Sequence, residues 1–274
     1  MQEPNRLESG SKVWLLCDLG NSCLKAGLVW GTPSDPSPEF EPLVEITHKR
    51  GESWDPIRRF LDGKDIRPNG IAVSSVAEST TCDSLLTALQ RPGFPPVVVN
   101  PESGLELRVR HTETVGLDRL YAARGAFWRV DSTPAIVVDA GTALTVDAVV
   151  QSKIPGQAAF LGGAIAPGPS MLAKALGAGG AQLHTIQTCP GAHALGRETQ
   201  EALASGVVVG FEGAALHLVE RIAEEAGLEQ PPVVLTGGAG DFLEPIFRRR
   251  FCTVYREPHM VPMGLWLAVW EGSS

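Results

Sequence analysis

Two stretches of the sequence carry an aspartate and a glycine, two positions apart, directly after a run of apolar residues. The first contains Asp18 and Gly20, and the second contains Asp139 and Gly141. An apolar run of this kind predicts a buried strand, so each aspartate stands where a strand enters a tight turn. Glycine lets backbone N–H groups come close to a ligand, and a carboxylate beside such a turn can face phosphate oxygens through a cation. The pattern therefore points to nucleotide chemistry.

One copy of this pattern has a simpler explanation, an ordinary hairpin in which Asp139 and Thr142 only satisfy hydrogen bonds of the turn. The recurrence favours nucleotide chemistry, since each copy continues into a second apolar strand. We therefore expect a duplicated domain in which two phosphate-facing hairpins meet over one cleft. The alignment of the two copies pairs three positions: Asp18 with Asp139, Gly20 with Gly141, and Val29 with Val150.

Length and composition indicate a globular chain with a sizeable core. It has 274 residues, of which 43% are hydrophobic, enough for one large domain or two modest ones, and the repeat favours two. The formal net charge of −8 argues against nucleic acid as the main partner, because binding a phosphate backbone needs a basic face.

Cysteine usage and the N-terminus favour a soluble cytoplasmic protein. The five cysteines form no Cys-x-x-Cys pair, which suits a reducing compartment and gives no zinc signature. The first twelve residues lack the apolar core of a signal peptide, and we expect them to be frayed. No apolar run is judged to reach membrane-spanning length, so no membrane partner is expected.

The rest of the sequence predicts layered α/β structure that positions these motifs. Residues 31–41 and 177–191 are expected to be loops, and the last helix is expected to be amphipathic, with Trp266 and Trp270 in the core. Besides the two hairpins, the pattern predicts strands at 43–47, 71–76, 96–100, 158–168 and 232–236, and helices at 54–61, 80–89, 169–176, 199–226 and 262–270.

The segment between the two halves combines an acidic and a basic side chain at the start of a predicted helix. Residues 105–111 alternate apolar and basic residues, and Thr114 is expected to cap the helix that follows. Asp118 and Arg119 then fall in its first turn. A purely structural role for this pair stays open, because the helix dipole favours an aspartate there and an arginine can pair on the surface.

Three further glycine stretches have two interpretations each. Gly162-Gly163 suggests that a backbone or a ligand packs closely. On the long predicted helix, a strip of three glycines indicates either packing within the chain or a dimer seam: Gly206, Gly210 and Gly213. The turn 236–240 is either a cradle for adenosine or phosphate at a helix N-terminus or a generic connection. Neither a P-loop nor a G-x-G-x-x-G fingerprint is present to explain these glycines.

Together these blocks resemble the type III pantothenate kinase family of the acetate kinase, sugar kinase, Hsp70 and actin superfamily. The Asp-x-Gly blocks mark only the superfamily, and the Gly-x-Asp-Arg block makes the resemblance fairly specific. It covers most of the chain through these blocks: 18–22 with Lys25 and Gly27, 116–119, 139–143 with Thr145 and Asp147, 162–168, Thr199 before Ser205-Gly206, and 236–238.

The resemblance implies an α/β fold of two duplicated ribonuclease H-like (actin-like ATPase) domains, with mixed central sheets and an interdomain cleft. The expected domains are residues 12–131 and 132–274. The implied activity is the ATP-dependent phosphorylation of pantothenate to 4′-phosphopantothenate, the first committed step of coenzyme A biosynthesis. The implied enzyme is a kinase, a transferase that binds ATP and metal ions.

The resemblance also implies roles for individual residues. Asp118 is the expected proton acceptor for the attacking hydroxyl, Asp18 lies near Mg²⁺, and Asp139 binds the monovalent cation, K⁺ or NH₄⁺. Thr142 contacts ATP. The ATP phosphates are held by Asp18, Leu19, Gly20, Asn21, Ser22, Cys23, Leu24 and Lys25. The pantothenate site, which the family shares across a homodimer, is lined by Gly116, Leu117, Asp118, Arg119 and Thr199.

The sequence departs from the family pattern at two positions. Ser22 stands where the family often has Thr, a change that keeps the hydroxyl. Val109 stands where the family commonly has a substrate-contacting Tyr, and Arg110 or His111 is a candidate to fill that space. The alternatives are a superfamily kinase for another small alcohol, sugar or carboxylate, and a nucleotide-binding regulator without useful turnover.

Overall fold

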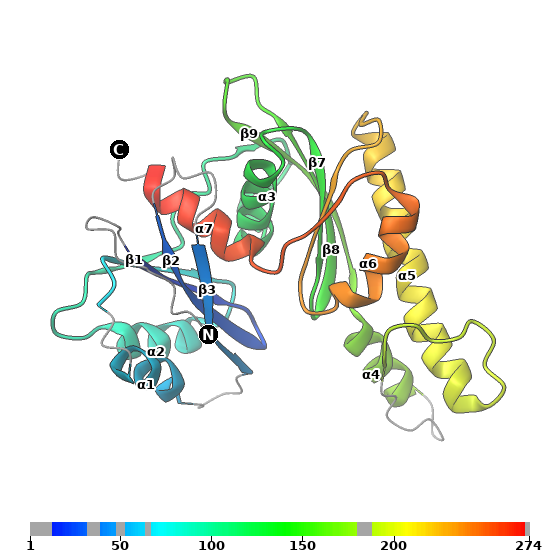
Figure 1. Ribbon diagram of the computed structural model, residues 1–274, viewed down its shortest axis with the longest axis horizontal. Coiled ribbons are helices and arrows are strands. Elements are labelled where there is room, and N and C mark those ends of the chain that lie inside the picture. Colours follow the sequence, from blue (N-terminus) through cyan, green and yellow to red (C-terminus); the bar gives the residue numbers. More distant parts are fainter. Residues whose placement is uncertain (1–12, 32–38, 48–52, 64–66, 180–187, 272–274) are drawn as a thin grey trace, which may run out of the picture. The chain divides into compact units, whose positions relative to one another are not determined.

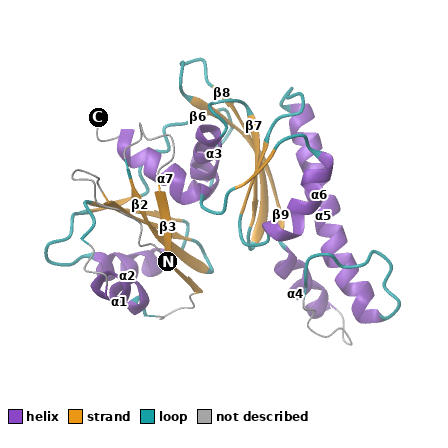
Figure 2. Cartoon of the chain, in the orientation of Figure 1, coloured by secondary structure: helices purple, strands orange, loops and turns teal. Residues whose placement is uncertain are grey.

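The structure is a computed structural model that describes residues 13–31, 39–47, 53–63, 67–179 and 188–271. The expected frayed N-terminus lies outside these residues. The chain divides into two compact units, each an α/β assembly of a sheet and helices (Figures 1 and 2). Unit 1 comprises Met1–Gly104, Val115–Tyr121 and Val261–Ser274, and unit 2 comprises Leu105–Thr114 and Ala122–Met260. These units are discontinuous in sequence, and the domain boundary after residue 131 stays a prediction.

Unit 1 contains a five-stranded mixed sheet in the order β3-β2-β1-β4-β5. β1 runs antiparallel to β2 and parallel to β4. The turn after Asp18 and the carboxyl end of β4 therefore lie at the same end of the strands. The strands are β1 (Val13–Leu19), β2 (Cys23–Trp30), β3 (Glu39–Thr47), β4 (Gly70–Ser75) and β5 (Val97–Val99).

Helices α1 (Asp55–Gly63) and α2 (Ser79–Leu89) share the core with one face of this sheet. Alternate residues of β1, namely Leu15, Cys17 and Leu19, are fully buried in that core. Since neighbouring residues of a strand point to opposite faces, Asp18 points to the other face.

The last helix, α7 (Met260–Glu271), also belongs to unit 1 except for its first residue, as does the start of α3 (Leu117–Arg129). Gly264 of α7 lies so close to the backbone of Tyr121 that a Cβ there would collide with the Tyr121 carbonyl. The expectation that α7 is amphipathic was wrong, because all its residues from Met260 to Val269 are buried. Its assignment to the core is confirmed by Trp266, which is fully buried.

Unit 2 contains a six-stranded mixed sheet in the order β11-β10-β7-β8-β9-β6. β7 runs antiparallel to β8 and parallel to β10, which in turn runs parallel to β11. The strands are β6 (Glu106–Leu107), β7 (Ala135–Ala140), β8 (Ala143–Gln151), β9 (Ala158–Pro167), β10 (Val233–Thr236) and β11 (Val254–Arg256).

The helices of unit 2 after β9 are α4 (Pro169–Gly179), α5 (Thr199–Glu225) and α6 (Gly240–Arg250). α5 runs along the sheet with α6 beside it (Figure 1). Phe211, Ala215 and Val219 of α5 are buried in one core with Ile136, Val138 and Ala140 of β7. Asp139 therefore points to the opposite face of the sheet.

The two sheets share one topology, which confirms the duplicated hairpin expected from the sequence. β3-β2-β1-β4-β5 corresponds to β9-β8-β7-β10-β11, with the same parallel and antiparallel pairings. The alignment of the second strands is one residue off: Asp18 pairs with Lys25, whereas Asp139 pairs with Thr145. The first turn is one residue longer, so Val29 corresponds to Val149 and not to Val150.

Several element boundaries differ from the expected ones, each for a local reason. β3 begins at Glu39, inside the stretch expected to be a loop, because it pairs with β2. The alternating stretch 105–111 forms only the two-residue β6, and the short β11 was not expected. Thr114 does not cap α3. Its hydroxyl donates to the carbonyl of His111 at 2.9 Å and closes the 3₁₀ turn Thr112–Thr114.

The statement that no apolar stretch reaches membrane-spanning length was also wrong. α5 is long and apolar enough to cross a membrane by length and composition, and a third of its apolar window is buried. α5 is apolar because one side of it packs on the sheet and because alanines and glycines occupy much of the rest of the helix. A core helix of this composition passes the same test, so it is weak evidence for a membrane.

Candidate functional site

In unit 1, the β1–β2 turn forms a short exposed loop after Asp18. The N–H of Gly20 donates to the carbonyl of Cys23 at 2.9 Å and closes the turn. Asn21 and Ser22 are exposed at its tip, while Asp18 and Lys25 are half-buried partners on the two strands. The turn therefore presents short polar side chains that can donate to phosphate oxygens, beside a carboxylate that can face phosphate through a cation.

The neighbouring strand β4 brings an orphaned hydroxyl next to Asp18. Ser74 is the Cα partner of Asp18, so both side chains point to the same face of the sheet. Ser74 is fully buried, and its Oγ has no hydrogen-bond partner among the described residues. Asn100 shapes this edge, because its side chain accepts from Ser75 N–H at 2.7 Å and donates to Ser75 carbonyl at 3.3 Å. Neither Ser74 nor Asn100 was predicted from the sequence.

The turn also carries Cys23, a half-buried thiol whose Sγ lies 3.5 Å from a carboxylate oxygen of Glu45. Burial, followed by the charge of Glu45, raises the pKa of the Cys23 thiol to about 11. Burial and the charge of Asp18 raise the pKa of Cys17, which lies in the core, to about 12. Both cysteines are therefore neutral thiols at neutral pH, which agrees with a packing role.

We expect Cys23 to resist alkylation at pH 8. A thiol with a pKa near 11 has a thiolate fraction roughly 10²-fold below that of an ordinary cysteine. Iodoacetamide labelling followed by peptide mass spectrometry compares Cys23 with the exposed Cys189 and Cys252 in the same sample. Glu45→Gln removes a cause of the raised pKa and is expected to speed labelling of Cys23. Equal labelling of all three cysteines would contradict the raised pKa of the Cys23 thiol.

Asp118 lies in the first turn of α3, as expected, and together with the Gly116–Arg119 block it belongs to unit 1. One carboxylate oxygen of Asp118 accepts from Arg119 N–H at 2.8 Å. The same oxygen occupies the space where a side chain on Gly116 would begin. Glycine at position 116 thus lets the carboxylate fold back over the start of the helix, where the helix dipole stabilises its charge.

In unit 2, the hairpin turn after Asp139 is supported by the turn between β9 and α4. Gly141 N–H donates to Ala143 carbonyl at 2.9 Å, and Gly168 N–H donates to Thr142 carbonyl at 3.1 Å. A Cβ on Gly168 would lie 2.5 Å from the carbonyl oxygens of Gly141 and Thr142. Only glycine permits this approach. The side chain of Thr142 stays exposed at the turn.

The loop between β10 and α6 reaches the same hairpin from the parallel neighbour. Ala239 N–H donates to Ala140 carbonyl at 2.7 Å. Gly237 has φ +86°, and a Cβ there would collide with Ala140 carbonyl and the Asp139 carboxylate. Three loops therefore converge within unit 2 at the carboxyl end of β7, where its neighbours change from antiparallel to parallel. Ligands of open α/β sheets usually bind outside the carboxyl ends of the parallel strands, and β7 and its parallel neighbour β10 end here.

The donors around Asp139 and Asp18 suit hard cations. Asp139 contributes carboxylate oxygens, and peptide carbonyls of the converging loops lie beside it. Asp18 has the orphaned Ser74 hydroxyl next to it. Mg²⁺ and K⁺ prefer oxygen ligands, so the residues fit these ions in donor type. Within the described residues no group of three or more His, Cys, Asp or Glu side chains could form an all-protein metal cage.

The double glycine of β9 has a structural explanation in close backbone packing. A Cβ on Gly163 would collide with the carbonyl of Val146 and with Asp147. Gly162, at φ +93°, is covered by the side chain of Val109 at 3.2 Å from its Cβ position. The residue at the position of the family's tyrosine therefore packs on β9. The packing interpretation of this glycine pair is confirmed.

Thr199, expected at the substrate site, is the first residue of α5 and is exposed. The turn before it is fixed by Arg197 N–H, which donates to Glu201 at 2.8 Å, and by Ser205, whose hydroxyl donates to Ala194 carbonyl at 2.8 Å. Thr199, Thr142 and Asp139 belong to unit 2.

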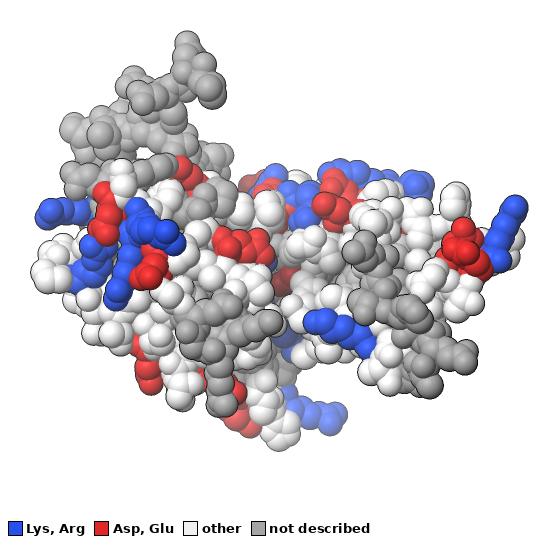
Figure 3. Space-filling view, turned by 90° about the horizontal axis from the view of Figure 1, so that it is seen from below, with Lys and Arg blue, Asp and Glu red and all other residues white. Residues whose placement is uncertain are grey.

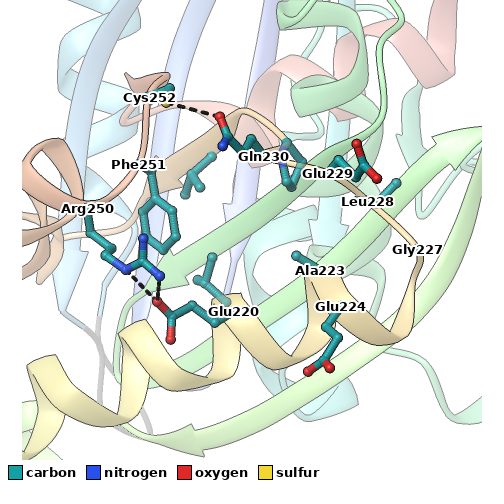
Figure 4. A pocket seen from close by; sticks show the side chains of 13 residues that line it. Glu220, Ala223, Glu224, Gly227, Leu228, Glu229, Gln230, Arg250, Phe251 and Cys252 are labelled. Atoms are coloured by element: carbon teal, nitrogen blue, oxygen red, sulfur yellow. Dashed lines mark hydrogen bonds and ion pairs between the residues drawn. The ribbon is translucent and has the colours of Figure 1, made fainter.

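A cavity of about 820 Å³ opens elsewhere in unit 2, between the end of α5, the loop before β10 and the turn from α6 to β11 (Figure 4). Its wall includes Phe251, the Arg250–Glu220 ion pair, and Cys252, whose thiol donates to Gln230 at 3.3 Å. None of the expected site residues lines it.

The described surface carries both acidic and basic side chains (Figure 3). On the face shown in Figure 3, acidic and basic side chains lie in mixed clusters separated by uncharged areas.

Two sheets of one topology, each with an aspartate hairpin at the end of its first strand, define the fold class of actin-like ATPases and sugar kinases. A solved structure from Campylobacter jejuni, assigned to the Baf family of transcriptional activators, is similar at a TM-score of 0.56 and 22% identity, over 94% of this chain and 98% of that one. The activator of 2-hydroxyisocaproyl-CoA dehydratase from Clostridium difficile is similar at a TM-score of 0.50 and 11% identity, over 96% and 95%.

The sequence comparisons narrow this class to one family. The profile of type III pantothenate kinases matches residues 14–221. A type III pantothenate kinase from Salinispora arenicola is 33% identical over 76% of this chain and 80% of its own length. One from Thermomicrobium roseum is 38% identical over 65% of this chain, and the match spans 66% of its own length. The chain belongs to the type III pantothenate kinase family.

Proposed function

We propose that this chain catalyses the ATP-dependent phosphorylation of pantothenate to 4′-phosphopantothenate, the first step of coenzyme A biosynthesis, in the cytoplasm. The observation that carries the proposal is the pair of equivalent aspartate hairpins in a chain of this family. Phosphoryl transfer depends mostly on alignment and charge neutralisation of the triphosphate, with a carboxylate to take the hydroxyl proton. Two carboxylate-bearing turns and Asp118 supply groups of these types.

In unit 1, the exposed turn residues Asn21 and Ser22 and the half-buried Lys25 are proposed to bind the ATP phosphates. Asp18 is proposed to hold Mg²⁺, whose chemistry is to neutralise phosphate charge. Asp118 is proposed to accept the proton from the pantothenate hydroxyl. Its bond from Arg119 N–H fixes one carboxylate oxygen and leaves the other to face the substrate.

In unit 2, Asp139 is proposed to bind the monovalent cation and Thr142 to contact ATP. The close support of this hairpin by Gly168 and Ala239 keeps both residues in place without reorganisation. Thr199 is proposed to contact pantothenate. Because Val109 packs on Gly162, the substrate contact that the family's tyrosine makes is proposed to fall to Arg110 or His111.

We also propose a homodimer that uses the exposed face of α5. A Cβ at Gly206, Gly210 or Gly213 would meet no atom of the described residues within 4 Å. The interpretation that these glycines serve packing within the chain is therefore wrong for the part of the chain that the structure describes. Nearby exposed apolar side chains support a partner: Met171 and Leu176 on α4, and Leu195 before α5.

The glycine strip gives a test of the dimer. Gly210→Glu improves helix propensity but puts a charge on the strip, so we expect monomers with an intact fold. Gly63→Glu is the matched control, since Gly63 lies at the end of α1 and also has nothing within 4 Å of its Cβ position. Light scattering after size exclusion gives the mass of each variant. If the Gly210→Glu variant is still a dimer, the glycine strip of α5 is not the dimer interface.

The proposed activity is tested by ADP formation with and without pantothenate, first in K⁺ buffer and then in Na⁺ buffer. We expect ADP only with pantothenate, and faster in K⁺. ADP formation with a different alcohol, sugar or carboxylate, and not with pantothenate, would identify another superfamily kinase. ATP binding without ADP formation from any acceptor would identify a regulator.

A further inference from the structure

Arg256, the last residue of the short strand β11, is bonded to the glycine loop between β10 and α6. Its guanidinium donates to the carbonyl of Gly237 at 2.9 Å and to that of Leu235 at 3.4 Å. Its acidic partners on α6 are more distant, Asp241 at 3.5 Å and Glu244 at 3.9 Å. The Arg256 side chain is only 19% exposed. Its closest bond therefore goes to the loop and not to the helix.

The sequence of the loop is adapted to this arginine. A Cβ on Gly240, the first residue of α6, would lie 2.5 Å from the central carbon of the Arg256 guanidinium and 2.6 Å from one of its nitrogens. Glycine at position 240 thus makes room for the guanidinium at the start of the helix. The cation sits at the positive end of the α6 dipole, an unfavourable position that the Gly237 and Leu235 carbonyls and the carboxylates of Asp241 and Glu244 offset.

The loop has a second anchor on the Asp139 hairpin. Ala239 N–H donates to Ala140 carbonyl at 2.7 Å, and Gly237 lies against the Asp139 carboxylate. Gly240 N–H donates to Gly237 carbonyl at 3.1 Å, so this carbonyl accepts from both the turn and Arg256. The loop is therefore fixed at two points, the hairpin and the guanidinium.

The contact with Arg256 sets the direction of one backbone donor of the loop. The carbonyl of Gly237 and the N–H of Gly238 belong to one trans peptide and point in opposite directions. Since Arg256 holds the carbonyl, the Gly238 N–H points away from Arg256. Within the described residues this N–H makes no hydrogen bond. A free N–H just before a helix N-terminus is a donor suited to an anion.

We propose that Arg256 is a positioning residue for the nucleotide, which holds the 236–240 loop so that the Gly238 N–H donates to ATP. This inference rests on the proposed use of ATP by this chain. Arg256 does not touch the nucleotide. Its positive charge near the α6 N-terminus adds to the attraction for the phosphates, while Asp241 and Glu244 limit its cost.

The test measures the dissociation constants of ATP and ADP by calorimetry for the full chain and its variants. Arg256→Gln is expected to weaken ATP binding about tenfold, the scale of one lost hydrogen bond to a charged group. kcat at saturating ATP and KM for pantothenate are expected to change less than about threefold. Arg256→Lys is expected to recover part of the affinity, since an ammonium reaches one carbonyl but lacks the planar fork.

Arg248→Gln is the matched control. Arg248 also joins α6 to β11, through the Val254 carbonyl at 3.2 Å, and it pairs with Glu244 of its own helix at 2.6 Å, but it has no hydrogen bond to the loop among the described residues. Its ATP affinity is expected to stay within about twofold of the parent, below the loss of one such bond. Hydrogen exchange of the amides 237–240 is expected to speed up only in Arg256→Gln.

Gly240→Ala tests the same contact from the other side. The added methyl displaces the guanidinium and is expected to weaken ATP binding as Arg256→Gln does. Because both changes break one contact, the double variant is expected to lose no more affinity than either single variant.

Each outcome has a separate meaning. If Arg256→Gln binds ATP as tightly as the parent, or if Arg248→Gln loses as much, Arg256 is not a positioning residue. If the parent chain itself does not bind ATP, the proposed function fails first. If the parent binds ATP but phosphorylates another acceptor, the role of Arg256 stands and only the acceptor changes.

Discussion

Asp118→Asn is expected to lower kcat by about 10²–10⁴-fold, the usual effect of losing a general base. The amide keeps the shape of the side chain, and its oxygen can still accept from Arg119 N–H, as the carboxylate does at 2.8 Å. The fold and the affinity for ATP should therefore stay close to those of the parent. What the amide loses is the ability to take the hydroxyl proton. The measurement is kcat at saturating ATP and pantothenate.

The matched control for this prediction is Asp55→Asn. Asp55 also lies in the first turn of a helix of unit 1, α1, and is exposed. Its loss is expected to leave kcat unchanged. Near-normal turnover of Asp118→Asn would remove Asp118 from the mechanism, and thermal unfolding of both variants shows whether a fall in turnover comes from a damaged fold.

The aspartate hairpins were predictable because each combines two independent signals, an apolar strand and a glycine turn. In the structure, the two hairpin turns lie at the equivalent end of the strands in two sheets of the same topology. The register was not predictable to the residue. The alternation of side chains along a strand does not show how many residues the turn contains. Only the strand pairing shows that the first turn is one residue longer.

Features that depend on tertiary contacts left no local signal. β11 has three residues, too few for a periodic pattern, so Arg256 had no predicted neighbour. Ser74 follows an apolar run like any strand-end serine, and its orphaned hydroxyl is visible only once β4 lies beside β1. The membership of α7 in unit 1 is likewise set by packing, where Gly264 meets the backbone of Tyr121.

The predicted site residues fall into two groups. Unit 1 carries the turn residues 18–25 and the block 116–119, and unit 2 carries Asp139, Thr142 and Thr199. Each group has local support in its own unit, such as the folded-back carboxylate of Asp118 and the glycines that hold the Asp139 hairpin. Single variants from each unit therefore test the two groups separately.

Asp139→Asn is expected to lower kcat/KM for ATP by about 10²–10³-fold, the effect of losing one preorganised charged group at a phosphate site. The amide keeps the volume that packs against Gly237, so the hairpin and the 236–240 loop should remain folded. The variant lacks the negative charge that attracts a cation. The stimulation of turnover by K⁺ over Na⁺ should therefore disappear along with most of the activity.

The ratio of rates in K⁺ and Na⁺ separates this effect from a general loss of stability. A variant that is only less stable loses activity equally in both buffers, because unfolding removes whole molecules from the assay. Asp131→Asn is the control in the same unit, since Asp131 is exposed with φ +53°, a conformation that Asn tolerates well. An unchanged K⁺-to-Na⁺ ratio in Asp139→Asn would place the monovalent cation away from this hairpin.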